Sequence, residues 1–129
     1  MSAYKEIGSL KTGSYILIDG NVCEVVSIEK SKPGKHGAAK AKITAIGVFD
    51  GTKRTLIGPV NKKVEVPIVE KRRGQVISIQ PEIIQIMDLE TYEVLEAPKP
   101  DEELLKKLKS GVEIEYWTSM GKVKITRLA

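Results

Sequence analysis

The chain consists largely of short runs of β-branched and other apolar residues separated by turn residues, a pattern that argues against a helical protein. The run SYILID (14–19) is followed by Gly20-Asn21 and then by VCEVVSIE (22–29), an order that predicts a hairpin. Further strands are expected at 41–49, 53–58 and 64–68, the last of them interrupted by Pro67. Several short strands at this spacing predict a small barrel.

A second set of strands follows the charged stretch EKRRG (70–74). Its strands are expected at 75–80, 82–90, 91–97, 112–119 and 122–128. Three strands, a helix and two strands is the order of an OB-fold, a five-stranded barrel. The sequence therefore predicts an all-β protein of two small barrels with one short helix, divided into domains 1–68 and 69–129. The alternative is one continuous sandwich.

The helix of the second domain is predicted over 98–111, between its third and fourth strands. Pro100 and Asp101 start it, acids fill its first turn, lysines fill its last turn and Gly111 ends it. Its apolar face consists of Leu104, Leu105 and Leu108.

Length and composition indicate an ordinary folded protein. The chain has 129 residues, 41% hydrophobic and 29% charged, which suffices for one medium domain or two small ones. No apolar run approaches the roughly 20 residues that span a bilayer, and the N-terminal residues lack a signal-peptide pattern, so we expect a cytoplasmic protein. Cys23 is the only cysteine, which excludes an internal disulfide; its apolar neighbours favour a buried structural thiol.

The charge is concentrated in residues 30–42, KSKPGKHGAAKAK. This segment contains Lys30, Lys32, Lys35, Lys40, Lys42 and the only histidine, His36. Gly34 and Gly37 flank Lys35 and permit a sharp loop that offers the amine outward. The segment contributes +5, whereas the formal charge of the whole chain is +4. One concentrated basic loop suits a local contact with a polyanion.

Other kinds of site fit the basic segment less well. A phosphate-binding P-loop is excluded because His36 follows Gly34-Lys35, Glu29 occupies the position of the first glycine, and the next segment is strand-like. A catalytic lysine needs a pKa lowered by burial or a close cation, and a solvated loop provides no burial. One histidine and one cysteine do not make a metal-ligand set. A solvated lysine-rich turn and a polyanion-binding loop both remain open.

The aromatic residues are few and dispersed, and Tyr116-Trp117 is the only adjacent pair. Neighbouring residues of a strand face opposite sides, so one of the two is expected in the core. Residues 69–129 carry ten Lys/Arg and eleven Asp/Glu. Without net positive charge or several aromatic platforms, the C-terminal half is expected to be a poor general binder of single strands.

The segment SKPGKHGAAKAK closely resembles the modification loop of the translation factor 5A family, the archaeal and eukaryotic counterpart of bacterial elongation factor P. The GVFDG turn (47–51) and the VEVPIVEK, QVISI and IQIMDLET stretches are also similar, so the resemblance covers essentially the whole chain. Ala38, where eukaryotic members usually have histidine, looks archaeal. Pro33 departs from the threonine usual in eukaryotic relatives.

The resemblance implies an SH3-like N-terminal barrel, a C-terminal OB-fold and a modified lysine. By position, Lys35 is converted to hypusine or to its precursor deoxyhypusine; which is the final form stays open. Deoxyhypusine synthase would make this change with NAD and spermidine, so the chain needs no cofactor or metal and is not an enzyme. The further residues expected to contact tRNA or the synthase are Lys32, Gly34, His36, Gly37, Lys40 and Lys42.

The implied partners are the ribosome, the P-site tRNA, other RNA and the synthase. No membrane contact is expected, and the chain is expected to be a monomer. Such a factor promotes peptide-bond formation and relieves stalling. Two alternatives stay open: a general RNA-binding OB-fold protein, and an enzyme with a reactive loop lysine.

Overall fold

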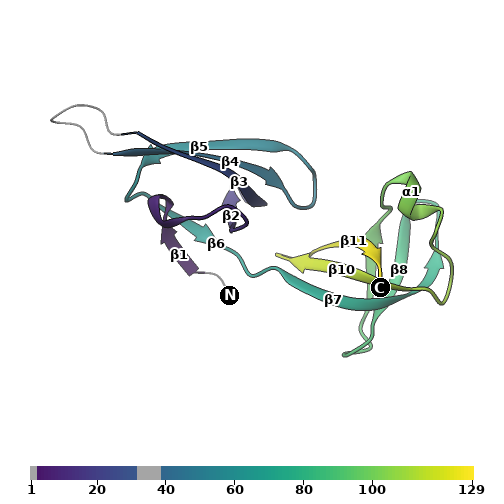
Figure 1. Ribbon diagram of the computed structural model, residues 1–129. Coiled ribbons are helices and arrows are strands. Elements are labelled where there is room, and N and C mark those ends of the chain that lie inside the picture. The colour runs from purple at the N-terminus through teal and green to yellow at the C-terminus, as the bar shows by residue number, and fades with distance from the viewer. Residues whose placement is uncertain (1–2, 32–38) are drawn as a thin grey trace. The chain divides into compact units, whose positions relative to one another are not determined.

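The computed structural model describes residues 3–31 and 39–129 of the chain. The chain forms two compact units, Met1–Ile68 and Val69–Ala129 (Figure 1). Each unit has its own hydrophobic core. Strands make up nearly all of the regular structure, and a single short α-helix is present among the described residues. The predicted all-β class is confirmed.

The first unit is a curled antiparallel sheet in the order β2-β3-β4-β5, together with a two-stranded ribbon of β1 and β6. The sheet strands are β2 (Tyr15–Ile18), β3 (Asn21–Ser31), β4 (Lys40–Gly47) and β5 (Lys53–Pro59). Alternate residues of β4, namely Ala41, Ile43 and Ala45, are buried in the core. The predicted hairpin of β2 and β3 is confirmed, and β3 continues two residues further than expected.

The N-terminal segment was not predicted to be structured. It forms β1 (Ala3–Glu6), all of whose residues are exposed, and a 3₁₀ turn (Ile7–Ser9). β1 pairs with β6 (Lys63–Val66), and the backbone N–H of Ile7 donates to the carbonyl of Lys62 at 2.8 Å. A strand without buried side chains has no alternating pattern, so only its pairing reveals it.

The second unit is a five-stranded antiparallel sheet in the order β11-β10-β7-β8-β9. The strands are β7 (Glu70–Ile79), β8 (Ile83–Asp88), β9 (Val94–Pro98), β10 (Glu113–Ser119) and β11 (Lys122–Leu128). The edge strands β9 and β11 lie beside each other, so the sheet curls into an open barrel. The order of three strands, a helix and two strands is the one predicted for an OB-fold.

The helix is much shorter than the predicted span of 98–111. α1 covers only Glu102–Leu105, and Asp101 caps it by accepting a hydrogen bond from the backbone N–H of Leu104 at 2.9 Å. After the helix, the backbone N–H groups of Lys107 and Leu108 donate three residues back, and this tighter turn brings Leu108 into the core. The capping residue and the apolar residues were predicted correctly, but the predicted helix was too long.

β7 begins at Glu70, five residues before the strand predicted from the sequence. The charged stretch is a strand because β10 pairs with it from Glu70 opposite Thr118 onward. Its side chains alternate between the two faces, and Arg72 on the inner face meets a buried carboxylate. No helix of the described residues is long and apolar enough to cross a membrane.

Gly74 provides a test of the packing of the second unit. A Cβ there would lie 3.1 Å from the carbonyl oxygen of Met87 and 3.2 Å from the Tyr116 ring. We expect Gly74→Ala to lower the free energy of unfolding by about 2 kcal/mol in urea titrations, because backbone and a buried ring must both move. Gly58→Ala is the control, since its nearest contact is the flexible Lys62 side chain. Equal losses in the two variants would contradict this account.

Candidate functional site

The strands β3 and β4 flank the basic segment and pair up to their ends. The last pair is Ser31 opposite Lys40, preceded by Lys30 opposite Ala41 and by Glu29 opposite Lys42. The last three residues of β3 are all exposed, so the strand continues beyond the buried part of the sheet. The predicted site residues Lys32, Gly34, Lys35, His36 and Gly37 lie outside the described residues.

The two described lysines of the predicted site lie on one face of β4. Lys40 and Lys42 are exposed and alternate with the buried Ala41 and Ile43, so both project from the outer face of the sheet. Lys30, opposite Ala41, is on the other face of the hairpin. The structure thus brings Lys40 and Lys42 together and separates Lys30 from them.

The second strand of the hairpin, β4, is anchored at its N-terminal end. The backbone N–H of Val60 donates to the carbonyl of Ala39 at 3.0 Å, and the N–H of Gly8 donates to the carbonyl of Val60 at 2.9 Å. The first residues of β4 are therefore tied to the end of β5 and to the N-terminal 3₁₀ turn. Both attachment points of residues 32–38 are thus held by hydrogen-bonded strands.

Cys23 has the structural role predicted for it. Its side chain is fully buried, and a guanidinium nitrogen of Arg54 lies 3.9 Å from the sulfur while the same guanidinium pairs with Asp50. Burial raises the pKa of the Cys23 thiol. A buried thiol that resists ionisation does not act as a nucleophile.

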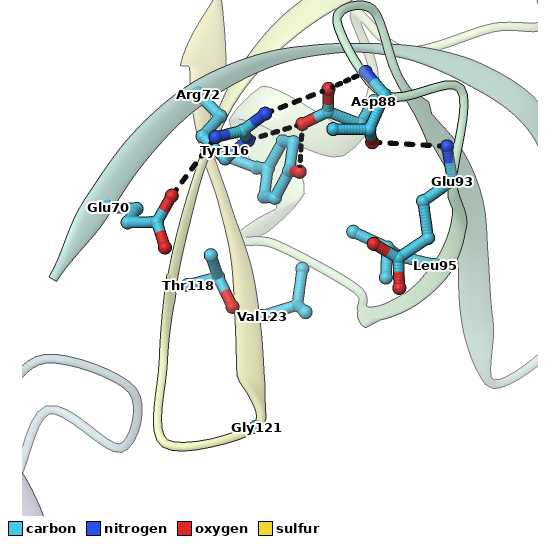
Figure 2. Close-up of a pocket in the computed structure, with 10 residues that line it drawn as sticks. Glu70, Arg72, Asp88, Glu93, Leu95, Tyr116, Thr118, Gly121 and Val123 are labelled. Carbon is cyan, nitrogen blue, oxygen red and sulfur yellow. Dashed lines mark hydrogen bonds and ion pairs between the residues drawn. The ribbon is translucent and has the colours of Figure 1, made fainter. Parts of the chain in front are cut away.

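The second unit contains a pocket that sequence reasoning missed (Figure 2). Its volume is about 460 Å³. It is lined by Glu70, Arg72, Asp88, Thr91, Glu93, Leu95, Tyr116, Thr118, Gly121 and Val123. Three carboxylates and one guanidinium make the lining net acidic, so the pocket does not suit phosphate.

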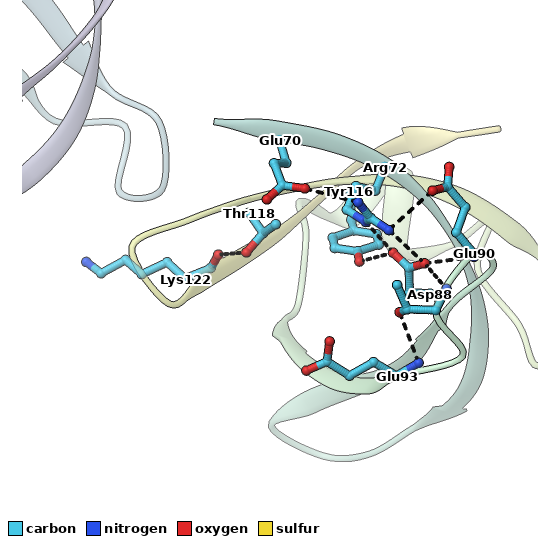
Figure 3. A network of polar contacts seen from close by, with 9 residues as sticks. Glu70, Arg72, Asp88, Glu90, Glu93, Tyr116, Thr118 and Lys122 are labelled. Carbon is cyan, nitrogen blue, oxygen red and sulfur yellow. Dashed lines mark hydrogen bonds and ion pairs between the residues drawn. The ribbon is translucent and has the colours of Figure 1, made fainter. Parts of the chain in front are cut away.

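A network of polar contacts forms one wall of this pocket (Figure 3). Asp88 is 1% exposed, and its carboxylate accepts hydrogen bonds from Arg72 Nε at 2.6 Å and from the Tyr116 hydroxyl. It also accepts from the backbone N–H groups of Glu90 and Thr91, both at 2.8 Å. The carboxylate joins β7, β8 and β10 through side chains that are distant in sequence.

The electrostatics of this network favour a fixed charge pair. The Arg72 guanidinium holds the pKa of Asp88 well below its usual range, and the hydrogen bond from Tyr116 acts in the same direction. Burial, reinforced by the Asp88 charge, raises the pKa of Tyr116. Arg72 also contacts Glu70 at 3.0 Å and Glu90 at 3.5 Å. Because the charges and hydrogen-bonding groups of this network are paired with one another, we interpret it as a structural anchor and not as a site of acid–base catalysis.

The pair Tyr116-Trp117 is divided as predicted. Tyr116 is 2% exposed and belongs to the core of the second unit, while Trp117 is only partly buried and belongs to neither core. Within residues 3–31 and 39–129, no group of three or more His, Cys, Asp or Glu side chains is arranged to hold a metal ion.

Replacing Asp88 tests the anchor. Asp88→Asn keeps the shape but leaves the Arg72 guanidinium without its buried counter-charge, so we expect a loss of about 3 kcal/mol in the free energy of unfolding. Glu93→Gln is the matched control: it removes a carboxylate from the same pocket, but an exposed one, and should change stability by less than about 0.5 kcal/mol. Similar small effects in both variants would show that the network does not stabilise the fold.

The anchor also predicts a pH dependence. The pKa of Asp88 is depressed in the folded state, so its stabilisation is fully present above the pKa of about 4 of an unfolded aspartate and is lost as the pH falls further. The stability difference between the wild type and Asp88→Asn should therefore shrink from about pH 7 to about pH 3. Urea titrations at several pH values measure it, and a constant difference would contradict the assignment.

Two family models match the chain in succession. Residues 2–62 match the model described as "Translation initiation factor 5A-like, N-terminal". Residues 68–128 match the one described as "Eukaryotic elongation factor 5A hypusine, DNA-binding OB fold". Together the two models account for nearly the whole chain.

Curated relatives and solved structures agree with these matches. Translation initiation factor 5A of Hyperthermus butylicus is 54% identical over 126 residues, which cover 97% of this chain and 93% of the relative. The protein of that name from Metallosphaera sedula is 54% identical, covering 97% and 96%. The structure titled "Eukaryotic translation initiation factor 5A from Methanococcus jannaschii" superposes with a TM-score of 0.88 at 48% identity, covering 99% of this chain and 95% of that one. A family protein from Naegleria fowleri gives a TM-score of 0.82 at 33% identity, covering 98% and 97%.

Proposed function

Because the chain belongs to the translation initiation factor 5A family, we propose that it binds the ribosome beside the P-site tRNA and promotes peptide-bond formation through a modified Lys35. The modification is hypusine or deoxyhypusine, and the factor relieves stalled ribosomes. The observation that carries this proposal is the pairing of β3 and β4 up to Ser31 and Lys40, which attaches the basic segment to the end of a long, hydrogen-bonded hairpin.

The geometry of the hairpin supports the proposal that the Lys35 side chain extends away from the barrel into a narrow site. The last three residues of β3 are exposed, so this end of the strand lies outside the hydrophobic core. Addition of an aminobutyl group would lengthen the Lys35 side chain and give it a second cationic nitrogen. Gly34 and Gly37 have no side chains beside it, which suits entry into a narrow site.

The lysines around Lys35 suit contacts with phosphate. Lys40 and Lys42 project from the same face of β4, and with Lys32 and His36 they would neutralise phosphates of the tRNA without reading its sequence. Peptide-bond chemistry stays with the ribosome, and the factor contributes by orienting the tRNA. The similar proteins of Hyperthermus butylicus and Metallosphaera sedula are translation factors by name, which supports a non-enzymatic role.

The modifying enzyme would be a second partner. In this proposal deoxyhypusine synthase transfers the aminobutyl group of spermidine to Lys35 with the help of NAD, so neither NAD nor spermidine is a cofactor of this chain. The same exposed hairpin would present the lysine first to the synthase and later to the ribosome.

The test uses Lys35→Arg, which keeps the charge but cannot accept the aminobutyl group. The variant and the wild type are produced in an archaeal host with its own synthase. Intact-mass measurement should find the added group on the wild type and not on the variant, and a reporter with consecutive prolines should stall only with the variant.

Lys40→Arg is the control for this experiment, because it makes the same exchange at an exposed lysine of the same segment. It should be modified and active. Full relief of stalling by Lys35→Arg would refute the proposal. If the affinity for RNA depended only on the number of lysines, with Lys35 no more important than Lys40, the result would favour a general RNA-binding protein instead.

A further inference from the structure

The outer face of β7, β10 and β11 surrounds the only tryptophan of the chain with cations. In the strand register, Trp117 of β10 lies between Lys71 of β7 and Lys124 of β11. Glu115 lies in the next row, between Arg73 and Arg127. Directly opposed residues of an antiparallel pair project from the same face, so these side chains share one surface, which we name the indole–cation face.

Polar contacts hold the indole on this face. The Trp117 Nε1 donates to Glu115 Oε1 at 3.1 Å, and the same carboxylate accepts from Arg127 Nη2 at 3.0 Å. The Lys71 Nζ lies 4.4 Å from the centre of the indole ring. Since Trp117 belongs to neither hydrophobic core, its ring is oriented at the surface by charged neighbours.

The charge of this face differs from that of the unit that carries it. Its cations are Lys71, Arg73, Lys122, Lys124 and Arg127, all of them exposed. Only two acids, Glu113 and Glu115, share the face, giving a balance of +3. Residues 69–129 as a whole have one more acid than they have cations. The fold has therefore separated charges that are mixed along the sequence.

The acidic pocket lies on the other face of the same strands. Arg72 and Tyr116, which line it, alternate with Arg73 and Trp117 of the indole–cation face. Figure 3 shows the Lys122 side chain directed away from the Asp88 network. One face of the sheet thus suits anions, and the other does not.

We propose that the indole–cation face binds single-stranded nucleic acid, with one base stacked on Trp117 and neighbouring phosphates contacted by Lys71, Lys124 and the flanking cations. An aromatic ring beside a row of cations matches a strand whose bases and phosphates alternate. Only unpaired nucleotides expose the face of a base for stacking. The inference does not depend on Lys35, which lies in the other unit.

Binding would proceed by an exchange at the ring. A base that stacks on the indole displaces the Lys71 ammonium, which then has a phosphate of the same strand within reach. Stacking of a base on an aromatic side chain is stronger than an exposed cation–π contact, so the exchange is favourable. Glu115 is a positioning residue, since it holds the indole nitrogen while the ring accepts the base.

The intrinsic fluorescence of Trp117 reports this contact directly, because the chain has no other tryptophan. The probe is an oligouridine of about ten nucleotides, within the site size of one OB-fold. The full chain is made in a host without the synthase, so that Lys35 is unmodified. Quenching should saturate on titration, and binding should weaken with salt by a slope of about −0.7 per phosphate neutralised. A duplex of the same length should leave the emission unchanged.

Variants separate this face from the basic segment. By anisotropy of a labelled oligouridine, Trp117→Leu should bind about tenfold more weakly, and Trp117→Phe should recover part of the loss. Lys71→Gln with Lys124→Gln should weaken binding and lower the salt slope. Lys106→Gln with Lys107→Gln removes the same charge from exposed lysines after α1 and should change neither.

The outcomes are decisive in both directions. A chain with Lys35, Lys40 and Lys42 all changed to glutamine should still show the quenching, which places the contact on the second unit. Absence of quenching, equal quenching by the duplex, or equal losses in the Lys71/Lys124 and Lys106/Lys107 pairs would overturn the inference. None of these results bears on the aminobutyl group of Lys35, so the two proposals can fail separately.

Discussion

The register of β3 against β4 is the constraint on which the proposed site depends. Ala41, Ile43 and Ala45 are buried and alternate with outward residues that include Lys40 and Lys42. A slip of one residue would bury the lysines and expose the core, so the hydrophobic effect permits a single pairing. That pairing sets Ser31 opposite Lys40 and thereby determines where the basic segment leaves the sheet.

In the second unit the same alternation produces two surfaces of different chemistry. Tyr116 is directed inward to the buried carboxylate of Asp88, while the next residue, Trp117, is directed outward to Lys71. The ion pair between the buried Asp88 and the partly buried Arg72 holds β7 against β8. A buried carboxylate is tolerated only when it is fully hydrogen-bonded, and Asp88 meets this condition through side-chain and backbone donors.

The two proposals assign different physical roles to the two units. In the first proposal, the first unit would carry a reaching group on its hairpin, and its action would depend on one modified side chain. The second presents a broad sheet face, whose affinity would come from several phosphate contacts and one stacked base. A factor that reaches into a narrow site gains from a second contact of this kind, because two linked contacts raise the effective concentration of each.

The sequence by itself determined the fold class, most strands, the cap at Asp101, the burial of Cys23 and the family, because these depend on local alternation, turn residues and a specific motif. The roles of Lys35 and its neighbours stay predictions, since residues 32–38 lie outside the described residues. Tertiary structure decided the rest. Pairing with β10 made a strand of the charged stretch at Glu70, and packing shortened the helix. Arg72 pairs with Asp88, sixteen residues away in sequence. Three different strands place Lys71, Trp117 and Lys124 side by side. Such contacts join residues far apart in sequence, and only the folded register brings them together.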